Sequence, residues 1–254
     1  MAQKQQRIAL IYNPIAGKGS HRLYRLQKAL KISAYTMSQM TSIESIIQKF
    51  QSYSQDISLY KTDYPGHAEI LSHQLKQDPP DKVVVIGGDG TISEVIQGLA
   101  GSDSALGIIP YGSANVLASS LHLPEQIDTL IDNIVQSHGK EIDLGACNGR
   151  YFSCMMGCGF DATVTKNVSN TLKKRLGPLA YVITSGKILF QRDYQHITIQ
   201  DPTQNWTSSG YYIVIGNTRF YGGTRVMTDR ARHDDGLLDI CVLKKPGLLP
   251  LLSY

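Results

Sequence analysis

The stretch VVVIGGDGTISEV, Val83–Val95, joins an apolar run to a glycine-rich loop and then to a helical pattern. A fully apolar run is typical of a strand that is covered on both faces of a parallel sheet. Glycines allow the backbone to approach an anion closely, and the first N–H groups of a helix lack partners. The stretch therefore predicts a buried strand that ends in an anion-binding loop.

The same alternation of strand and helix runs through the first half of the chain. Strands are predicted at 7–12, 56–62, 82–86 and 105–110, and helices at 21–31, 67–75, 91–100 and 113–121. This order favours an α/β fold, a parallel sheet with helices on both faces. Residues 32–55 are polar with weak periodicity, so we expect a loop or insertion there.

After Pro124 the pattern changes to antiparallel strands. A hairpin is predicted at Asn148-Gly149, a strong signal for a type I′ turn. Helices are expected at 125–137, 166–176 and 178–190, and strands at 196–200, 206–217 and 236–243. We therefore expect two domains, an α/β nucleotide-binding domain over 1–125 and a β-rich, sandwich-like domain over 126–254.

Composition narrows the class of protein. A net charge of +4 is too small for a nucleic-acid-binding protein, but it permits contact with phosphates or anionic lipid. The four cysteines form no C-x-x-C pair and are expected to be free thiols of a reducing compartment. No signal peptide is visible, and no segment approaches the roughly 20 apolar residues of a membrane helix. These features favour a cytoplasmic protein that meets a membrane only at its surface.

Three loops share the character of the first one. Residues 13–20, 87–91 and 110–115 each follow a predicted strand and lead to a helix. Ligands of parallel α/β sheets bind at the carboxyl ends of the strands, so three such loops predict a polyphosphate site. The Walker pattern does not fit, because Gly19 follows Lys18. The run Gly157–Ala162 matches G-x-G-x-x-A, but it lies in the β-rich half, away from a βαβ unit.

Together these motifs resemble the catalytic region of bacterial diacylglycerol kinases and related lipid kinases. The resemblance rests on N-P-x-x-G, G-G-D-G-T, P-x-G-S-x-N and D-D-G-x-L-D, in this order, and it extends from about Arg7 to Lys245. It implies an ATP-dependent kinase that phosphorylates the hydroxyl of diacylglycerol or a similar lipid. It also implies peripheral contact with an anionic membrane surface. The oligomeric state stays open, a homodimer included.

The resemblance also assigns roles to single residues. The nucleotide-binding set would be Asn13, Pro14, Gly17, Lys18, Thr62, Gly87, Gly88, Asp89, Gly90, Thr91, Gly112, Ser113 and Asn115. Asp89 would face the metal-bound phosphates; from the residues alone, it either contacts the metal or only bonds local N–H groups. A structural Mg²⁺ would be held by Asp235 with main-chain oxygens of Arg232 and Leu237.

One family feature is absent from this sequence. The family carries a general base, a Glu in a D-G-E motif, some tens of residues beyond the D-D-G stretch, whereas this chain ends at Tyr254 without D-G-E. A positioned base contributes about 10²–10⁴-fold to the rate. We therefore expect a truncated chain with low activity of its own. A nucleotide-binding regulatory module without catalysis is the alternative outside the enzymes.

The acceptor lipid is less well defined by the sequence. A sphingoid base, another lipid or NAD are alternatives to diacylglycerol, and the acceptor would lie between the domains. Apolar candidates for its contacts are Phe160, Tyr181, Phe220 and Tyr221. A basic group that could dock anionic headgroups consists of Lys166, Lys173, Lys174 and Arg175.

Overall fold

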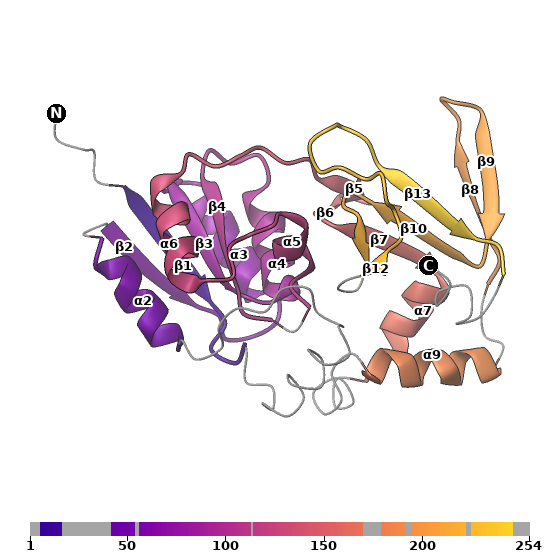
Figure 1. The fold of residues 1–254 in the computed structure, drawn as a ribbon, viewed down its shortest axis with the longest axis horizontal. Coiled ribbons are helices and arrows are strands. Elements are labelled where there is room, and N and C mark those ends of the chain that lie inside the picture. Colours follow the sequence, from indigo (N-terminus) through magenta and orange to yellow (C-terminus); the bar gives the residue numbers. More distant parts are fainter. Residues whose placement is uncertain are drawn as a thin grey trace.

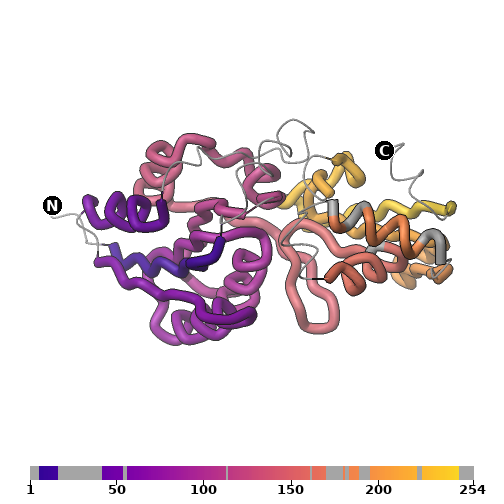
Figure 2. The backbone as a smooth tube through the Cα atoms, turned by 90° about the horizontal axis from the view of Figure 1, so that it is seen from below, coloured from indigo at the N-terminus to yellow at the C-terminus, as the bar shows by residue number. Residues whose placement is uncertain are grey.

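The computed structural model describes residues 6–16, 42–53, 56–112, 114–169, 179–191, 195–221 and 225–245. Two lobes lie side by side, the first built by the N-terminal half and the second by the C-terminal half (Figures 1 and 2). Within the described ranges, the helices are too short or too polar to cross a membrane.

The first lobe is built on a four-stranded parallel sheet in the order β2-β1-β3-β4. Its strands are β1 (Arg7–Tyr12), β2 (Asp56–Lys61), β3 (Lys82–Gly87) and β4 (Ala105–Pro110). Strand β1 pairs with β3 from Ile8↔Lys82 to Tyr12↔Ile86, and β3 pairs with β4 up to Gly87↔Pro110. The predicted parallel sheet is confirmed, and its carboxyl ends meet at one edge.

Helices cover both faces of this sheet (Figure 1). Successive side chains of a strand point to opposite faces, and Ile8 and Leu10 pack in one cluster while Ala9 and Ile11 pack in the other. The first cluster includes α2 (Ile43–Gln51) and α6 (Ile127–Gln136); the second includes α3 (His67–Leu75) and α4 (Asp89–Leu99). Two-sided burial explains why β3 is apolar from Val83 to Ile86.

The expectation of a loop or insertion over 32–55 is wrong for its last part. Helix α2 begins after Ser42, whose side chain accepts a hydrogen bond from the Ser45 N–H. Ile46 and Phe50 are fully buried against the sheet. Burial of such side chains stabilises the fold by about 1.5–3 kcal/mol each, so an amphipathic face outweighs the polar residues before it. The helix predicted at 21–31 lies outside the described residues.

Two helices of the first lobe differ in their bounds from the prediction. Helix α4 begins at Asp89, so the second half of the G-G-D-G loop forms its first turn. Helix α5 is only Val116–Ser120 and follows Asn115, which has a left-handed backbone (φ 49°). The loop after β4 is consequently longer, and it reaches back over the end of β3.

Helix α6 belongs to the first lobe by its packing. Leu130, Ile131 and Val135 lie in the core cluster on one face of the parallel sheet. The buried Lys82 of β3 donates three hydrogen bonds from its Nζ atom to the carbonyls of Ile134, Val135 and Ser137 at the end of α6, at 2.6–2.8 Å. We therefore place the division between domains after α6 rather than near residue 125.

The second lobe is rich in antiparallel strands. Its main sheet has the order β13-β10-β7, formed by Asp239–Leu243, Tyr212–Gly216 and Met155–Gly159. Two-stranded ribbons accompany it: β5 (Gly145–Cys147) with β6 (Arg150–Phe152), β8 (Ile197–Asp201) with β9 (Trp206–Gly210), and β11 (Phe220–Tyr221) with β12 (Arg225–Val226). Helices α7 (Phe160–Asn167) and α9 (Leu179–Gln191) pack together beside the sheet. The antiparallel fold class is confirmed.

Three details of the second lobe follow from backbone geometry. The β5–β6 turn has left-handed Asn148 (φ 49°) and Gly149 (φ 77°), as the predicted hairpin requires. The apolar run predicted as one strand over 206–217 is split at Tyr211 between β9 and β10, which belong to different sheets. Helix α7 begins at Phe160, six residues before the predicted helix at 166–176, and Gly159 (φ 80°) provides the sharp entry.

Candidate active site

The residues that follow β1, β2 and β4 are each bonded to the end of a neighbouring strand at the carboxyl edge of the sheet. The Asn13 N–H donates to the Ile86 carbonyl at 3.1 Å, and the Thr62 N–H donates to the Tyr12 carbonyl at 3.0 Å. The Tyr111 N–H donates to the Gly87 carbonyl at 2.8 Å. The structure thus brings the loops predicted from three separate stretches, and Thr62 as well, to one edge.

Two glycines let the loops after β3 and β4 cross in contact. A Cβ atom on Gly112 would lie 2.5 Å from the Gly88 Cα atom, and one on Gly88 would lie 3.0 Å from the Gly112 Cα atom. Such distances leave no room for a side chain on either residue. The two loops therefore form a single backbone surface.

Asn115 closes the loop after β4. Its side chain is 3% exposed; its Oδ1 atom accepts from the Gly112 N–H at 2.9 Å and its Nδ2 atom donates to the Gly112 carbonyl at 3.0 Å. An asparagine tolerates the left-handed backbone that this turn requires. The P-x-G-S-x-N motif is therefore explained as a self-bonded turn that starts α5.

The Asp89 carboxylate connects the two crossing loops. Its Oδ1 atom accepts from the Val116 N–H at 2.7 Å, at the first residue of α5. Burial raises the pKa of Asp89, and hydrogen bonds from the backbone N–H groups of Val116, Asn115 and Leu117 partly oppose that rise. The geometry accounts for a loop-organising role, which the sequence left open beside metal contact.

The glycines of the G-G-D-G motif differ in whether the fold requires them. A Cβ on Gly87 would lie 2.8 Å from the Thr91 Cβ atom, so packing excludes a side chain there. A Cβ on Gly90 would meet nothing within 4 Å, and Gly90 lacks a positive φ. Neither packing nor backbone strain within the described chain requires glycine at 90. This position, in the first turn of α4, offers open space beside helical N–H groups.

The first loop joins the site through Asn13. Its Nδ2 atom lies 3.4 Å from the Thr91 Oγ1 atom, and its Oδ1 atom accepts from the Ile15 N–H at 3.0 Å in a local turn that contains Pro14. Asn13 thereby holds the start of this loop against α4. Gly17, Lys18 and Ser113 of the predicted set lie outside the described residues.

The predicted metal residues form a turn in the second lobe. The Asp235 Oδ1 atom accepts from the Leu237 N–H at 3.1 Å, around Gly236 (φ 72°). The Arg232 side chain contacts Asp234 instead. In the part of the chain that the structure describes, no three His, Cys, Asp or Glu side chains gather around one point. A magnesium ion here would depend on the Asp235 carboxylate and main-chain oxygens.

The lobes are joined by contacts that the sequence did not predict. Gln97 of α4 accepts from the Tyr151 N–H at 2.9 Å and donates to the Tyr151 carbonyl at 2.8 Å. Arg150 and Glu69 form a two-bond ion pair at 3.1 and 2.9 Å. These bonds fix the β5–β6 hairpin on α3 and α4. No spacing pattern in the sequence indicates these partners of Arg150 and Tyr151.

Of the other predicted residues, Phe160 is a core residue that is 3% exposed, and it packs with Tyr221 in the core of the second lobe. Phe220 is partly buried and lines a cavity between the lobes. Lys166 is exposed in the last turn of α7. The side chains of Tyr181, Lys173, Lys174 and Arg175 lie outside the described part of the chain.

Comparisons with known proteins cover both lobes of the chain. Residues 34–147 match the diacylglycerol kinase catalytic domain, and residues 154–253 match the YegS C-terminal NAD kinase beta sandwich-like domain. A diacylglycerol kinase of Staphylococcus carnosus is 29% identical over 97% of this chain and 76% of its own length. A diacylglycerol kinase of Staphylococcus aureus (strain Newman) is 26% identical over 97% of this chain and 73% of its own.

A solved structure shares the fold. The crystal structure of a diacylglycerol kinase from Bacillus anthracis (strain Sterne) superposes with a TM-score of 0.68 at 24% identity, covering 99% of this chain and 81% of that one. The two matched domains follow each other along the chain and correspond to the two lobes. The chain therefore belongs to the family of bacterial diacylglycerol kinases and related lipid kinases.

Proposed function

We propose that this chain binds ATP at the crossing glycine loops and transfers its γ-phosphoryl group to the hydroxyl of diacylglycerol, giving phosphatidic acid. The observation that carries the proposal is Gly90, whose missing side chain leaves open space at the start of α4 without any need from packing. A phosphate group fits such a position, because helical N–H groups and the helix dipole favour an anion.

The described residues divide the work of holding the donor. Gly88 and Gly112 allow the backbone of two loops to meet, Gly87 leaves room for the Thr91 side chain, and Asp89 fixes the relative position of the loops through the Val116 N–H. Asn13 holds the first loop against Thr91. Phosphoryl transfer depends mainly on positioning and on neutralisation of charge, and a rigid, bonded set of loops provides the positioning.

Magnesium is the metal that we propose for this function. It prefers carboxylate and water oxygens, and Asp235 with the main-chain oxygens of Arg232 and Leu237 would hold a structural ion. Bound ATP supplies the transferred group and brings its own metal-binding phosphates. Adding and chelating Mg²⁺ while following the unfolding of wild type and Asp235→Asn tests the site. A metal-dependent shift in wild type alone is expected, and an equal shift in both would refute it.

Transfer of label from γ-labelled ATP to a panel of acceptors tests the proposed reaction. The protein is kept in excess over ATP, so that a single turnover is visible. We expect label on diacylglycerol and less on ceramide, sphingosine or NAD. Label on a sphingoid base above diacylglycerol would support the alternative acceptor. Nucleotide binding without label on any acceptor would support a regulatory module.

Contact with an anionic membrane surface is the second part of the proposal. It rests on the basic group that includes Lys166, at roughly 1 kcal/mol per basic residue near such a surface. Co-sedimentation with anionic vesicles should weaken in the Lys173/Lys174/Arg175→Ala variant. Unchanged co-sedimentation would remove this part without touching the nucleotide site.

A further inference from the structure

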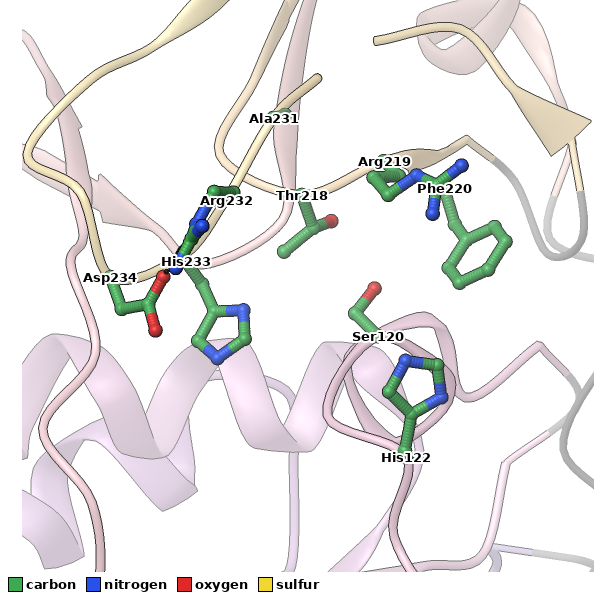
Figure 3. Close-up of a pocket in the computed structure, with 9 residues that line it drawn as sticks. All are labelled: Ser120, His122, Thr218, Arg219, Phe220, Ala231, Arg232, His233 and Asp234. Carbon is green, nitrogen blue, oxygen red and sulfur yellow. Dashed lines mark hydrogen bonds and ion pairs between the residues drawn. The ribbon is translucent and has the colours of Figure 1, made fainter. Parts of the chain in front are cut away.

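A cavity of about 230 Å³ lies where the two lobes meet, and the glycine loops do not line it (Figure 3). The first lobe contributes Ser120 and His122, at the end of α5 and just after it; the second contributes Thr218, Arg219 and the segment before β13. Ser120 is the last residue of α5 and Val116, bonded to Asp89, is the first. At a rise of 1.5 Å per residue, the cavity begins about 6 Å from that contact.

The charged side chains of the cavity have a positive excess. Arg219 and Arg232 line it together with a single carboxylate, Asp234. Lys140 (2.7 Å) and Arg232 (3.2 Å) both pair with Asp234. The charge of this carboxylate is therefore balanced by two cations of the chain. Within the described residues Arg219 makes no ion pair, so its charge is available to a ligand.

Side chains that can donate hydrogen bonds surround these charges. Figure 3 shows the imidazole rings of His122 and His233 on either side of the Ser120 side chain. His122 has a left-handed backbone (φ 51°), which is uncommon for a residue other than glycine and is found at ligand sites more often than elsewhere. Arginine with imidazole and hydroxyl donors is the set of groups that recognises a phosphate.

The size of the cavity limits the ligand. Pockets that enclose a drug-sized molecule measure about 300–1,000 Å³, and this one is smaller. A headgroup fits, whereas a lipid with its acyl chains would have to leave the cavity. A neutral glycerol hydroxyl offers nothing for the positive excess to bind, but a phosphate monoester does.

We propose that this cavity is a phosphate-monoester subsite between the lobes, separate from the site for the donor nucleotide. It rests on the proposed function only in naming a phosphorylated lipid headgroup as one source of that group; inorganic phosphate is the other. An occupied subsite would hold His122 of the first lobe and Arg219 of the second on the same ligand, and would thereby bridge the lobes.

Isothermal titration calorimetry with a saturating non-hydrolysable ATP analogue tests the subsite while the glycine loops are filled. The three titrants are inorganic phosphate, dihexanoyl phosphatidate and dihexanoyl glycerol. We expect the first two to bind and the neutral lipid to give no heat. Tighter binding of the phosphatidate would identify a lipid headgroup as the source, and equal affinity would identify free phosphate. Binding of the neutral lipid in competition with phosphate would overturn the proposal.

Two variants locate the binding. Arg219→Gln should weaken phosphate binding at least about 10-fold, while Arg230→Gln, after β12 and outside the cavity lining, should leave it unchanged. His122→Gln is a second variant on the other lobe. Equal affinities in wild type, Arg219→Gln and His122→Gln would refute the subsite. Because the analogue is titrated first in every sample, loss of nucleotide binding would count against the proposed function and loss of phosphate binding alone against the subsite.

Discussion

Gly90→Ala separates the needs of the fold from the needs of a ligand. Among the residues that the structure describes, the added Cβ atom would have no neighbour within 4 Å, and the backbone of Gly90 is not left-handed. An alanine at such a position restricts the unfolded chain and stabilises a protein by about 0.4–1 kcal/mol. In a chain of this length, that corresponds to a rise of about 1–4 °C in unfolding temperature. The same methyl group would stand where we place a phosphate.

Calorimetry with a non-hydrolysable ATP analogue measures the second effect. We expect at least about a 10-fold loss of affinity, or about 1.4 kcal/mol, in a protein that is slightly more stable than wild type. Gly186→Ala in α9 is the matched control, because its Cβ would also meet nothing within 4 Å; it should be stabilised equally and bind normally. Equal nucleotide affinity in Gly90→Ala and wild type would refute the placement of the phosphate.

Substitutions at three further positions test the contacts that hold the glycine loops and α6 in place. Gly112→Ala forces a Cβ to 2.5 Å from the Gly88 Cα atom, so we expect a loss of about 1–3 kcal/mol in unfolding free energy and weaker nucleotide binding. A denaturation curve equal to that of wild type would contradict the crossing of the loops. Asp89→Ala leaves the Val116 N–H without its acceptor and should cost about 1–3 kcal/mol, whereas Asp89→Asn should cost less because an oxygen remains. Burial raises the pKa of Asp89 in the folded protein. The unfolding free energy of wild type should therefore fall, relative to that of Asp89→Asn, as the pH rises from the ordinary carboxyl pKa through the raised one. A difference that does not change with pH would contradict that burial. Lys82→Met removes three hydrogen bonds from the end of α6, and urea denaturation should show a loss of about 1–3 kcal/mol, while an unchanged midpoint would mean that these bonds add nothing.

The parallel sheet could be predicted because its residues obey one local rule. The inner strand β3 is a short run that is buried on both faces, so it is apolar from Val83 to Ile86. Helix α2 was not predicted, although its apolar residues have helical spacing: Ile43, Ile46, Ile47 and Phe50. The polar residues before Ser42 weaken the helical periodicity when the whole segment 32–55 is considered. A window restricted to 43–51 would have found it.

The site could be predicted in its parts but not in its connections. Glycine-rich loops after strands indicate where an anion binds, and the parallel topology then brings them to one edge. The direction of the Asp89 carboxylate depends on where α5 begins, which the sequence placed too early. The Gln97–Tyr151 and Glu69–Arg150 contacts join residues 54 and 81 positions apart. No periodicity relates such pairs, because they arise from the docking of one lobe on the other.

The most direct test of the nucleotide site is hydrogen–deuterium exchange with and without a saturating non-hydrolysable ATP analogue. The account predicts protection in three segments at once, at 13–16, 87–91 and 111–116, because the loops are bonded into one surface. The β8–β9 ribbon, which lies far from this edge in Figure 1, should exchange equally in both states. Protection that omits 87–91, or that appears only in the second lobe, would contradict the claim that these crossing loops hold the phosphates of the donor.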